Sequence, residues 1–364
     1  MMDKENQFLQ LPATKIQNDE DFYNHIADML TLARQHAKRQ LDRTIVMTYF
    51  EIGKMIVERE QQGEKRAKYG AKLIKELSAY LTENLGKGFS VTNLKGFRSF
   101  YMAYAAQKGQ TLSDQFNLGW SHYQILMRIE NENARHFYEI EAANHQWTVR
   151  QLQRQVGSSL YERLALSRDK DEVVKLASKG QIIEKPSDIF KNPYVLEFTG
   201  LEERTGYSET DLEQALINNL QKFLLELGKG FLFEARQRRF SFEEKSFYVD
   251  LVFYNRLLQC YVIIDLKNAE LKHQDLGQMQ MYVNYFNRYV KQDFEKPTIG
   301  ILLCSKKDDN IVELTLPENS NIYASSYSLY LPDKSLLQSK LSEWIEEFED
   351  EQKLRKLTES GDVE

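Results

Sequence analysis

The sequence predicts a two-domain α+β chain, in which an all-α domain is followed by an α/β sandwich. Apolar residues recur at helical spacing through roughly the first 160 of the 364 residues. A charged segment containing two prolines then interrupts this pattern. The runs beyond it are short, aromatic and β-branched, which is typical of strands.

The helical domain is predicted to occupy residues 1–165 and a linker residues 166–192. Ile45, Tyr49 and Ile52 illustrate the apolar spacing that places one helix face against a core. The linker is predicted from the run KPSDIFKNP, because its prolines disfavour helical backbone in the residues that precede them.

The α/β domain is predicted to occupy residues 193–348, ahead of an acidic tail at residues 349–364. A first helix is predicted from Ser208, a cap residue, to Leu227, where Gly228 ends it. Four strands and a second helix follow. The strands are predicted at residues 230–240, 247–254, 261–267 and 298–304. The helix is predicted at residues 274–290, between the last two strands. A helix, three antiparallel strands, a helix and a strand form the order of an α/β sandwich.

Composition is typical of a soluble, cytoplasmic globular protein. The hydrophobic content of 42% can fill a core in each domain. No apolar run approaches the roughly 18 residues of a membrane span, and the N-terminus lacks the pattern of a secretory signal. Cys260 and Cys304 lie in apolar runs, so we expect them in the core and not in a disulfide framework or a zinc site.

Charge is distributed unevenly, although the net charge is only −6. Residues 34–98 contain 14 Lys and Arg against 7 Asp and Glu, whereas residues 306–364 contain 7 basic and 14 acidic residues. A basic helical domain can hold nucleic-acid phosphates, and solvated helix faces explain the same charges equally well.

Two predicted strands bring carboxylates and an ammonium group together. In FYVDLVFY, alternation places Asp250 among apolar neighbours, and in YVIIDLK it places Asp265 and Lys267 on one face at the strand end. Adjacent buried carboxylates are costly unless a cation offsets their repulsion, and Mg²⁺, or Mn²⁺ in its place, favours such oxygen ligands. Lys267 could orient or help deprotonate a water and neutralise phosphate charge. Phosphodiester hydrolysis needs these parts, although an isolated Asp-x-Lys more often marks a structural ion pair.

These residues resemble the PD-(D/E)XK nuclease superfamily, and more closely the bacterial YhcG-like family, which joins such a nuclease domain to a helical N-terminal domain. The runs YFEIGKMIVE, GFSVTNLKGFRSFY and LGWSHYQIL extend the resemblance over nearly the whole chain. It implies a restriction-endonuclease-like sandwich, with Asp250 as the first acid, Asp265 at the (D/E) position and Lys267 as the lysine. Glu is commoner in the family where Asp265 stands, and no proline precedes Asp250.

The resemblance adds further residues to the candidate site. Gln278, in GQMQMY, falls on the family's glutamine-bearing helix, and Tyr282, one turn later on the same face, is a candidate nucleic-acid contact. Glu213, in DLEQALINNLQ, corresponds to the acid of the first core helix and is a third candidate metal ligand. Without the resemblance, nothing separates Glu213 from a solvated residue such as Glu209.

Two basic segments supply the remaining candidate nucleic-acid contacts. One is EARQRRF, whose arginines either contact phosphates or protect an edge strand from unwanted pairing: Arg236, Arg238 and Arg239. The other has the outline of a helix-turn-helix, with Ser90 as a helix cap and Lys95 and Arg98 on the second helix. A generic helical hairpin over an aromatic core gives the same pattern.

The sequence thus predicts a Mg²⁺-dependent endonuclease that hydrolyses DNA in repair, recombination or defence. Two alternatives stay open: a catalytically silent DNA-binding or assembly protein on the same fold, and an RNA-directed nuclease. Because one nuclease site cuts one strand at a time, we expect a homo-oligomer, a dimer or tetramer, with the helical domain as a candidate interface. No membrane association is expected.

Overall fold

The computed structural model describes residues 18–61, 66–105, 116–166, 170–191, 193–201, 206–242, 245–317, 320–331, 333–339 and 341–342. The predicted acidic tail lies outside these ranges. The chain divides into two compact units, residues 1–153 and 154–364. Among the helices described, none is both long and apolar enough to cross a membrane.

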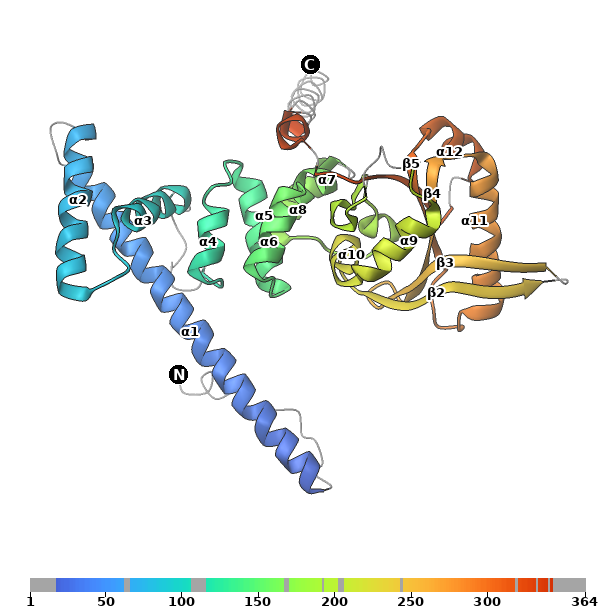
Figure 1. The fold of residues 1–364 in the computed structure, drawn as a ribbon, viewed down its shortest axis with the longest axis horizontal. Helices are drawn as coiled ribbons and strands as arrows, with labels where there is room; N and C mark the ends of the chain where they lie inside the picture. The colour runs from blue at the N-terminus through green and yellow to red at the C-terminus, as the bar shows by residue number, and fades with distance from the viewer. Residues whose placement is uncertain are drawn as a thin grey trace, which may run out of the picture. The chain divides into compact units, whose positions relative to one another are not determined.

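The first unit is helical, as predicted from its periodicity (Figure 1). Its elements are α1 (Asp19–Gln61), α2 (Arg66–Leu85), α3 (Val91–Tyr104), α4 (Trp120–Leu126), α5 (Glu132–Asn144) and most of α6 (Val149–Gly157). The predicted cap begins α3, since the Ser90 side chain accepts a hydrogen bond from the Asn93 backbone N–H at 3.2 Å. Helices α2 and α3 therefore form the predicted helix-turn-helix outline.

Aromatic side chains of α3 fill the core between α1, α3 and α4. The rings of Phe97 and Tyr49 stack with centroids 4.0 Å apart, and the ring of Trp120 meets both at an edge. Gly53 allows α1 and α3 to approach closely, because a Cβ there would lie 2.1 Å from the carbonyl oxygen of Phe97. The aromatic residues of this segment therefore pack the helical hairpin and are not available to enter a nucleic-acid groove.

The second unit contains a six-stranded mixed sheet, with the order β1-β6-β5-β4-β3-β2. Its strands are β1 (Tyr194–Val195), β2 (Phe231–Phe242), β3 (Lys245–Asn255), β4 (Cys260–Glu270), β5 (Ile299–Lys306) and β6 (Ile322–Ser328). The first three long strands pair antiparallel, as predicted, whereas β4, β5 and β6 are parallel neighbours. The sequence did not predict β1 or β6.

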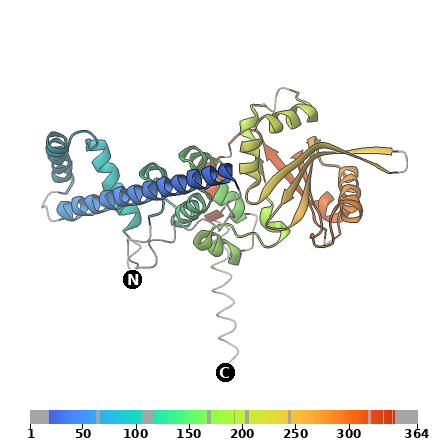
Figure 2. The same ribbon diagram turned by 90° about the horizontal axis from the view of Figure 1, so that it is seen from below.

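Helices cover both faces of this sheet, which makes the predicted sandwich (Figures 1 and 2). Leu251 and Ile264 face a core shared with α9 and α10, and Val252 and Ile263 face a core shared with α11. Cys260 and Cys304 are free and buried in these cores, as expected. The helical elements are α7 (Leu160–Leu166), α8 (Lys170–Lys179), η3 (Pro186–Ile189), η4 (Glu197–Thr199), α9 (Glu209–Asn218), α10 (Leu220–Leu227), α11 (His273–Tyr285), the π-helical turn η5 (Phe286–Val290) and α12 (Asp309–Thr315).

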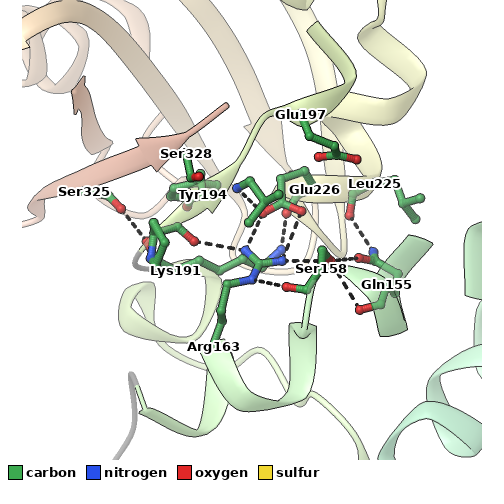
Figure 3. Close-up of polar contacts among 12 residues, drawn as sticks. Gln155, Ser158, Arg163, Lys191, Tyr194, Glu197, Leu225, Glu226, Ser325 and Ser328 are labelled. Carbon is green, nitrogen blue, oxygen red and sulfur yellow. Dashed lines mark hydrogen bonds and ion pairs between the residues drawn. The ribbon is translucent and has the colours of Figure 1, made fainter. Parts of the chain in front are cut away.

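Within the second unit, a buried ion cluster joins α7 and the end of α6 to α10 and β1 (Figure 3). The carboxylate of Glu226, on α10, accepts hydrogen bonds from Arg163 Nη1 at 2.6 Å, from the Val195 N–H at 3.0 Å and from Arg154 Nη1 at 3.4 Å. Burial by itself would raise the pKa of Glu226, but the charges of Arg163, Lys191 and Arg154 outweigh it and hold the pKa at about 2.

The two units divide at residues 153/154, whereas the sequence placed the end of the helical domain at 165. The segment predicted as a linker, residues 166–192, contains α8 and η3. Local periodicity does not locate this division, which follows from the contacts within each unit.

Candidate functional site

The candidate site lies where β3 and β4 separate, a place we call the fork. The two strands pair from Asn255 opposite Cys260 to Leu251 opposite Ile264. Asp250 is the next residue of β3 beyond these pairs. Its Oδ2 accepts a hydrogen bond from the Leu266 backbone N–H at 2.8 Å. The Asp250 side chain therefore satisfies a backbone N–H of β4 at the point where β3 no longer pairs with it.

Asp265, on β4, lies beside Asp250 at the fork and is only 3% exposed. Burial, followed by repulsion from the Asp250 carboxylate, raises the pKa of Asp265 to about 7. Its Oδ2 atom is buried and has no hydrogen-bond partner among the described residues. The ammonium of Lys267 lies 2.9 Å from this oxygen and partly offsets its charge, and a bound cation would offset the repulsion that remains between the two carboxylates.

Lys267 contributes the positive charge at the fork. Its Nζ forms an ion pair with Asp265 Oδ2 at 2.9 Å and lies 3.8 Å from Glu209 Oε2. Burial by itself lowers the pKa of Lys267, but the carboxylates of Asp265 and Glu209 outweigh it, so the pKa is raised. The side chain therefore acts at this site as an ammonium ion.

Glu213 reaches the same region from α9. It is 4% exposed, whereas the Glu209 side chain, one turn earlier, is 43% exposed. This difference separates the two acids, which the sequence alone could not do. Glu213 accepts hydrogen bonds from Arg236 Nε and, at 2.5 Å, from Gln237 Nε2.

Gln237 is a residue of the site that the sequence did not reveal. Its Nε2 bridges Glu213 Oε2, at 2.5 Å, and Asp250 Oδ1, at 2.9 Å. Its φ of +46° is unusual for a residue other than glycine and costs about 1 kcal/mol or more. This backbone conformation lies on β2 between the residues that pair with Leu251 and Val249. No local pattern in EARQRRF signals it, because it depends on the pairing with β3.

Helix α11 supplies Gln278 and Tyr282, one turn apart. Gln278 Nε2 donates a hydrogen bond to the Tyr282 hydroxyl. Burial, followed by the charge of Asp265, raises the pKa of Tyr282, so this hydroxyl lies within electrostatic reach of the fork. Tyr282 is 1% exposed. It therefore lies inside the site, and the sequence named it as a candidate nucleic-acid contact.

The structure gives each predicted basic contact a specific environment. Arg236 binds Glu213 and Gln214, so it supports the site from within. Arg238 pairs with Glu234, and Arg239 donates a hydrogen bond to Ser246 Oγ at 2.9 Å across the hairpin. In the first unit, Lys95 is exposed, whereas Arg98 pairs with Glu60 at 2.7 Å.

The fork fits a divalent cation held by two carboxylates. Asp250 and Asp265 offer hard oxygen atoms, one of them buried without a hydrogen-bond partner, which suits an ion such as Mg²⁺ that keeps several waters. Across the described residues, no group of three or more His, Cys, Asp or Glu is placed to hold a metal. Gln237 lies between Glu213 and Asp250, so Glu213 does not join the pair directly.

Comparison with known proteins identifies the family to which the chain belongs. Residues 187–342 match the model of the YhcG PDDEXK nuclease domain, and residues 25–163 match that of the DUF1016 N-terminal domain. The chain is 38% identical over 351 residues to "Putative nuclease YhcG" of Escherichia coli (strain K12), which covers 88% of this chain and 93% of that protein. The chain belongs to the YhcG family. The resemblance found in the sequence is thereby confirmed, as is the PD-(D/E)XK fold of the second unit.

Two solved endonuclease structures show a more distant likeness to this YhcG-family chain. One is a repair endonuclease from Pyrococcus abyssi, with 19% identity, a TM-score of 0.24 and coverage of 36% of this chain and 50% of that chain. The other is an EndoMS complex with double-stranded DNA, with 15% identity, a TM-score of 0.25 and coverage of 37% and 51%. At these TM-scores neither likeness supports an argument about function.

Proposed function

We propose that this YhcG-family protein is a divalent-metal-dependent endonuclease that hydrolyses phosphodiester bonds of DNA. The observation that carries the proposal is the fork, where the buried Asp265 lies beside Asp250, and burial and the repulsion between the two carboxylates raise the pKa of Asp265 despite the ammonium of Lys267 at 2.9 Å. The nucleic-acid class and the ion extend what the family establishes, which is a nuclease domain. Mg²⁺ is the proposed ion, with Mn²⁺ as a substitute.

Each residue of the fork has a proposed part in the reaction. Asp250 and Asp265 would hold the cation, which when bound polarises a phosphate oxygen and lowers the pKa of a bound water. Lys267 is better suited to stabilise phosphate charge and orient the attacking water than to accept its proton, because its pKa is raised. Gln278 and Tyr282 provide an amide and a hydroxyl on the α11 side, where they can position the water or the phosphate.

Metal-dependent cleavage tests this proposal directly. Purified protein should cut DNA with Mg²⁺ and be silent in EDTA, and Asp250→Ala, Asp265→Ala and Lys267→Ala should each reduce the rate by about 100-fold or more. Glu209→Ala is the matched control, since this acid contacts Lys267 but is not placed in the metal pair. Full activity in Asp265→Ala would rule out the proposed site.

A panel of duplex, single-stranded and branched DNA and of RNA decides the substrate class. Cleavage of RNA in preference to DNA would favour the RNA-directed alternative, and binding without cutting any substrate would favour a silent DNA-binding or assembly protein. A cytoplasmic role in repair, recombination or defence, and a dimer or tetramer that pairs two sites for duplex cleavage, complete the proposal. Light scattering at working concentration tests the oligomer, and a strict monomer would remove it.

A further inference from the structure

The β2–β3 hairpin continues past the fork as a two-stranded ribbon. Its pairing extends from the fork to Phe242 opposite Lys245, whereas the described pairing of β3 with β4 stops at Leu251. Figures 1 and 2 both show this hairpin reaching beyond the rest of the sheet, beside α11. A two-stranded ribbon is marginally stable by itself. The hairpin therefore needs a further contact to stabilise it, and it packs against α11.

A ladder of aromatic rings joins the hairpin to α11 and η5. The ring of Phe240 stacks on Phe247, with centroids 5.4 Å apart, and on Tyr285, at 4.0 Å. The ring of Tyr285 in turn contacts Tyr289 at 5.3 Å. The ladder explains how the hairpin is held. It does not explain why Tyr289, at the end of the ladder, is 63% exposed, or why Phe242, the last residue of β2, is 51% exposed.

These exposed rings border a groove of about 540 Å³ between the hairpin and α11. That volume is in the range of ligand sites. The described lining residues include two cations, Lys245 and Arg288, and no acid, while Glu243 and Glu244 lie outside the described residues. Aromatic faces beside cations complement nucleobases and phosphates.

A glycine keeps the α11 wall of the groove open. Gly277 lies in the second turn of α11, where glycine costs about 1 kcal/mol relative to alanine. A Cβ built there would meet nothing within 4 Å, so no internal contact of the described residues requires the missing side chain. The open backbone leaves room for a flat group to approach the helix, beside the polar pair of Gln280 and Asn284.

We propose that this groove binds a single-stranded segment of the DNA substrate, with bases stacked on Tyr289 and Phe242 and phosphates held by Arg288 and Lys245. The proposal rests on the proposed nuclease function, because it names the form of DNA that the same site receives. The groove adjoins the fork through Phe240, which lines it and contacts the ring of Tyr282 at 5.6 Å. Duplex DNA hides its base faces, so only unpaired bases can use such rings.

Binding in EDTA tests the groove without requiring cleavage. Fluorescently labelled oligo-dT, at low salt, should bind the wild-type chain at least tenfold more tightly than the double variant Phe242→Ala, Tyr289→Ala, as expected when one or two stacked bases are lost. Gly277→Leu should weaken binding similarly by filling the groove, and it has no φ strain or clash to relieve. Tyr248→Ala is the matched control, because Tyr248 is 48% exposed on the same hairpin but does not line the groove.

Further substrates separate stacking from charge and DNA from RNA. An abasic oligonucleotide should bind the wild type and the aromatic variants equally, and Arg288→Ala should weaken binding to both the abasic and the dT strand. Oligo-rU bound more tightly than oligo-dT would replace DNA with RNA as the ligand and overturn that part of the proposal.

Unchanged oligo-dT binding in the double variant and in Gly277→Leu would overturn the proposal, even if the wild type cuts DNA. A change of oligomeric state in these variants, seen by light scattering with no change in oligonucleotide binding, would overturn it in favour of a self-association surface. Conversely, groove-dependent binding by a protein that never cuts would refute the proposed nuclease function alone.

Discussion

Two buried carboxylates of the same unit, Glu226 and Asp265, differ in every respect that decides their role. Glu226 accepts bonds from two guanidinium groups and a backbone N–H, and its pKa is about 2 (Figure 3). Asp265 has an oxygen without a hydrogen-bond partner and a second carboxylate beside it, and its pKa is about 7. The cations around Glu226 outweigh its burial, whereas at Asp265 the ammonium of Lys267 does not outweigh burial and the neighbouring carboxylate.

The difference shows why burial alone does not identify a functional acid. A buried carboxylate with matched cations holds elements together, and here it joins α7 and the end of α6 to the nuclease sheet. A buried carboxyl group whose surroundings disfavour its ionised form lowers the stability of the fold. Such groups are typical of sites that bind or react. The expected effects are largest for removal of Glu226 and smallest for removal of Gln237.

Removing the carboxylate of Glu226 should destabilise the second unit. We expect Glu226→Ala to destabilise the second unit by about 3–5 kcal/mol, because the buried guanidinium of Arg163 would lose the carboxylate of its ion pair. Hydrogen exchange of the β4 and β5 amides in increasing urea reports on this unit alone. Glu197→Ala, which removes the partly exposed partner of Arg154, is the control and should cost below about 1 kcal/mol. Equal losses in the two variants would break the contrast.

The two acids should also give opposite dependences of stability on pH. The folded pKa of Glu226 is depressed, so its contribution is present above about pH 4.5 and is lost as the pH falls through about 2. The folded pKa of Asp265 is raised, so its contribution is present below about pH 4 and is lost as the pH rises through about 7.

In EDTA, the second unit of the wild type should therefore lose up to about 4 kcal/mol relative to Asp265→Asn between pH 4 and 8, at about 1.4 kcal/mol per pKa unit. The same exchange measurement at the two pH values checks it. Parallel pH profiles for the two proteins would show that Asp265 is satisfied after all.

A divalent cation should reverse the disadvantage of Asp265. Mg²⁺ at 100 times its dissociation constant should stabilise the second unit by about 2.7 kcal/mol at pH 8, and Asp250→Asn or Asp265→Asn should abolish the effect. Because Gln237 separates Glu213 from Asp250, we expect Glu213→Gln to keep most of it. Complete loss in Glu213→Gln would show that the cation draws this acid in as a third ligand.

The sequence predicted most of the sheet and the centre of the fork for a physical reason. Alternation along FYVDLVFY and YVIIDLK is a local property, so it fixed the faces of Asp250, Asp265 and Lys267 before their partners were known. The antiparallel order of β2, β3 and β4 followed from short connections. Strand β6, with the sequence IYASSYS, lacks a strong apolar pattern and was not predicted.

Local sequence patterns could not predict the features that depend on contacts between residues far apart in the chain. The division at 153/154 follows from the contacts within each unit, and the burial of Glu213 requires α9 to lie against β2. The family resemblance supplied Glu213 and Gln278, which periodicity could not distinguish from neighbouring residues. Neither source indicated Gln237, whose position depends on a positive φ in a strand.

That glutamine provides the smallest expected effect and the sharpest test of how the fork is organised. Gln237→Ala removes the two hydrogen bonds that the side-chain amide donates to Glu213 and to Asp250, while the Leu266 N–H still donates a hydrogen bond to Asp250. We expect cleavage to fall about tenfold, as when a group that orients metal ligands is lost. If Gln237 acts by positioning, the Mg²⁺ concentration needed for half-maximal rate should rise, and Gln237→Asn, with its shorter side chain, should not restore it. A variant as active as the wild type at every Mg²⁺ concentration would mean that the amide bridge is dispensable and that the two carboxylates at the fork are sufficient.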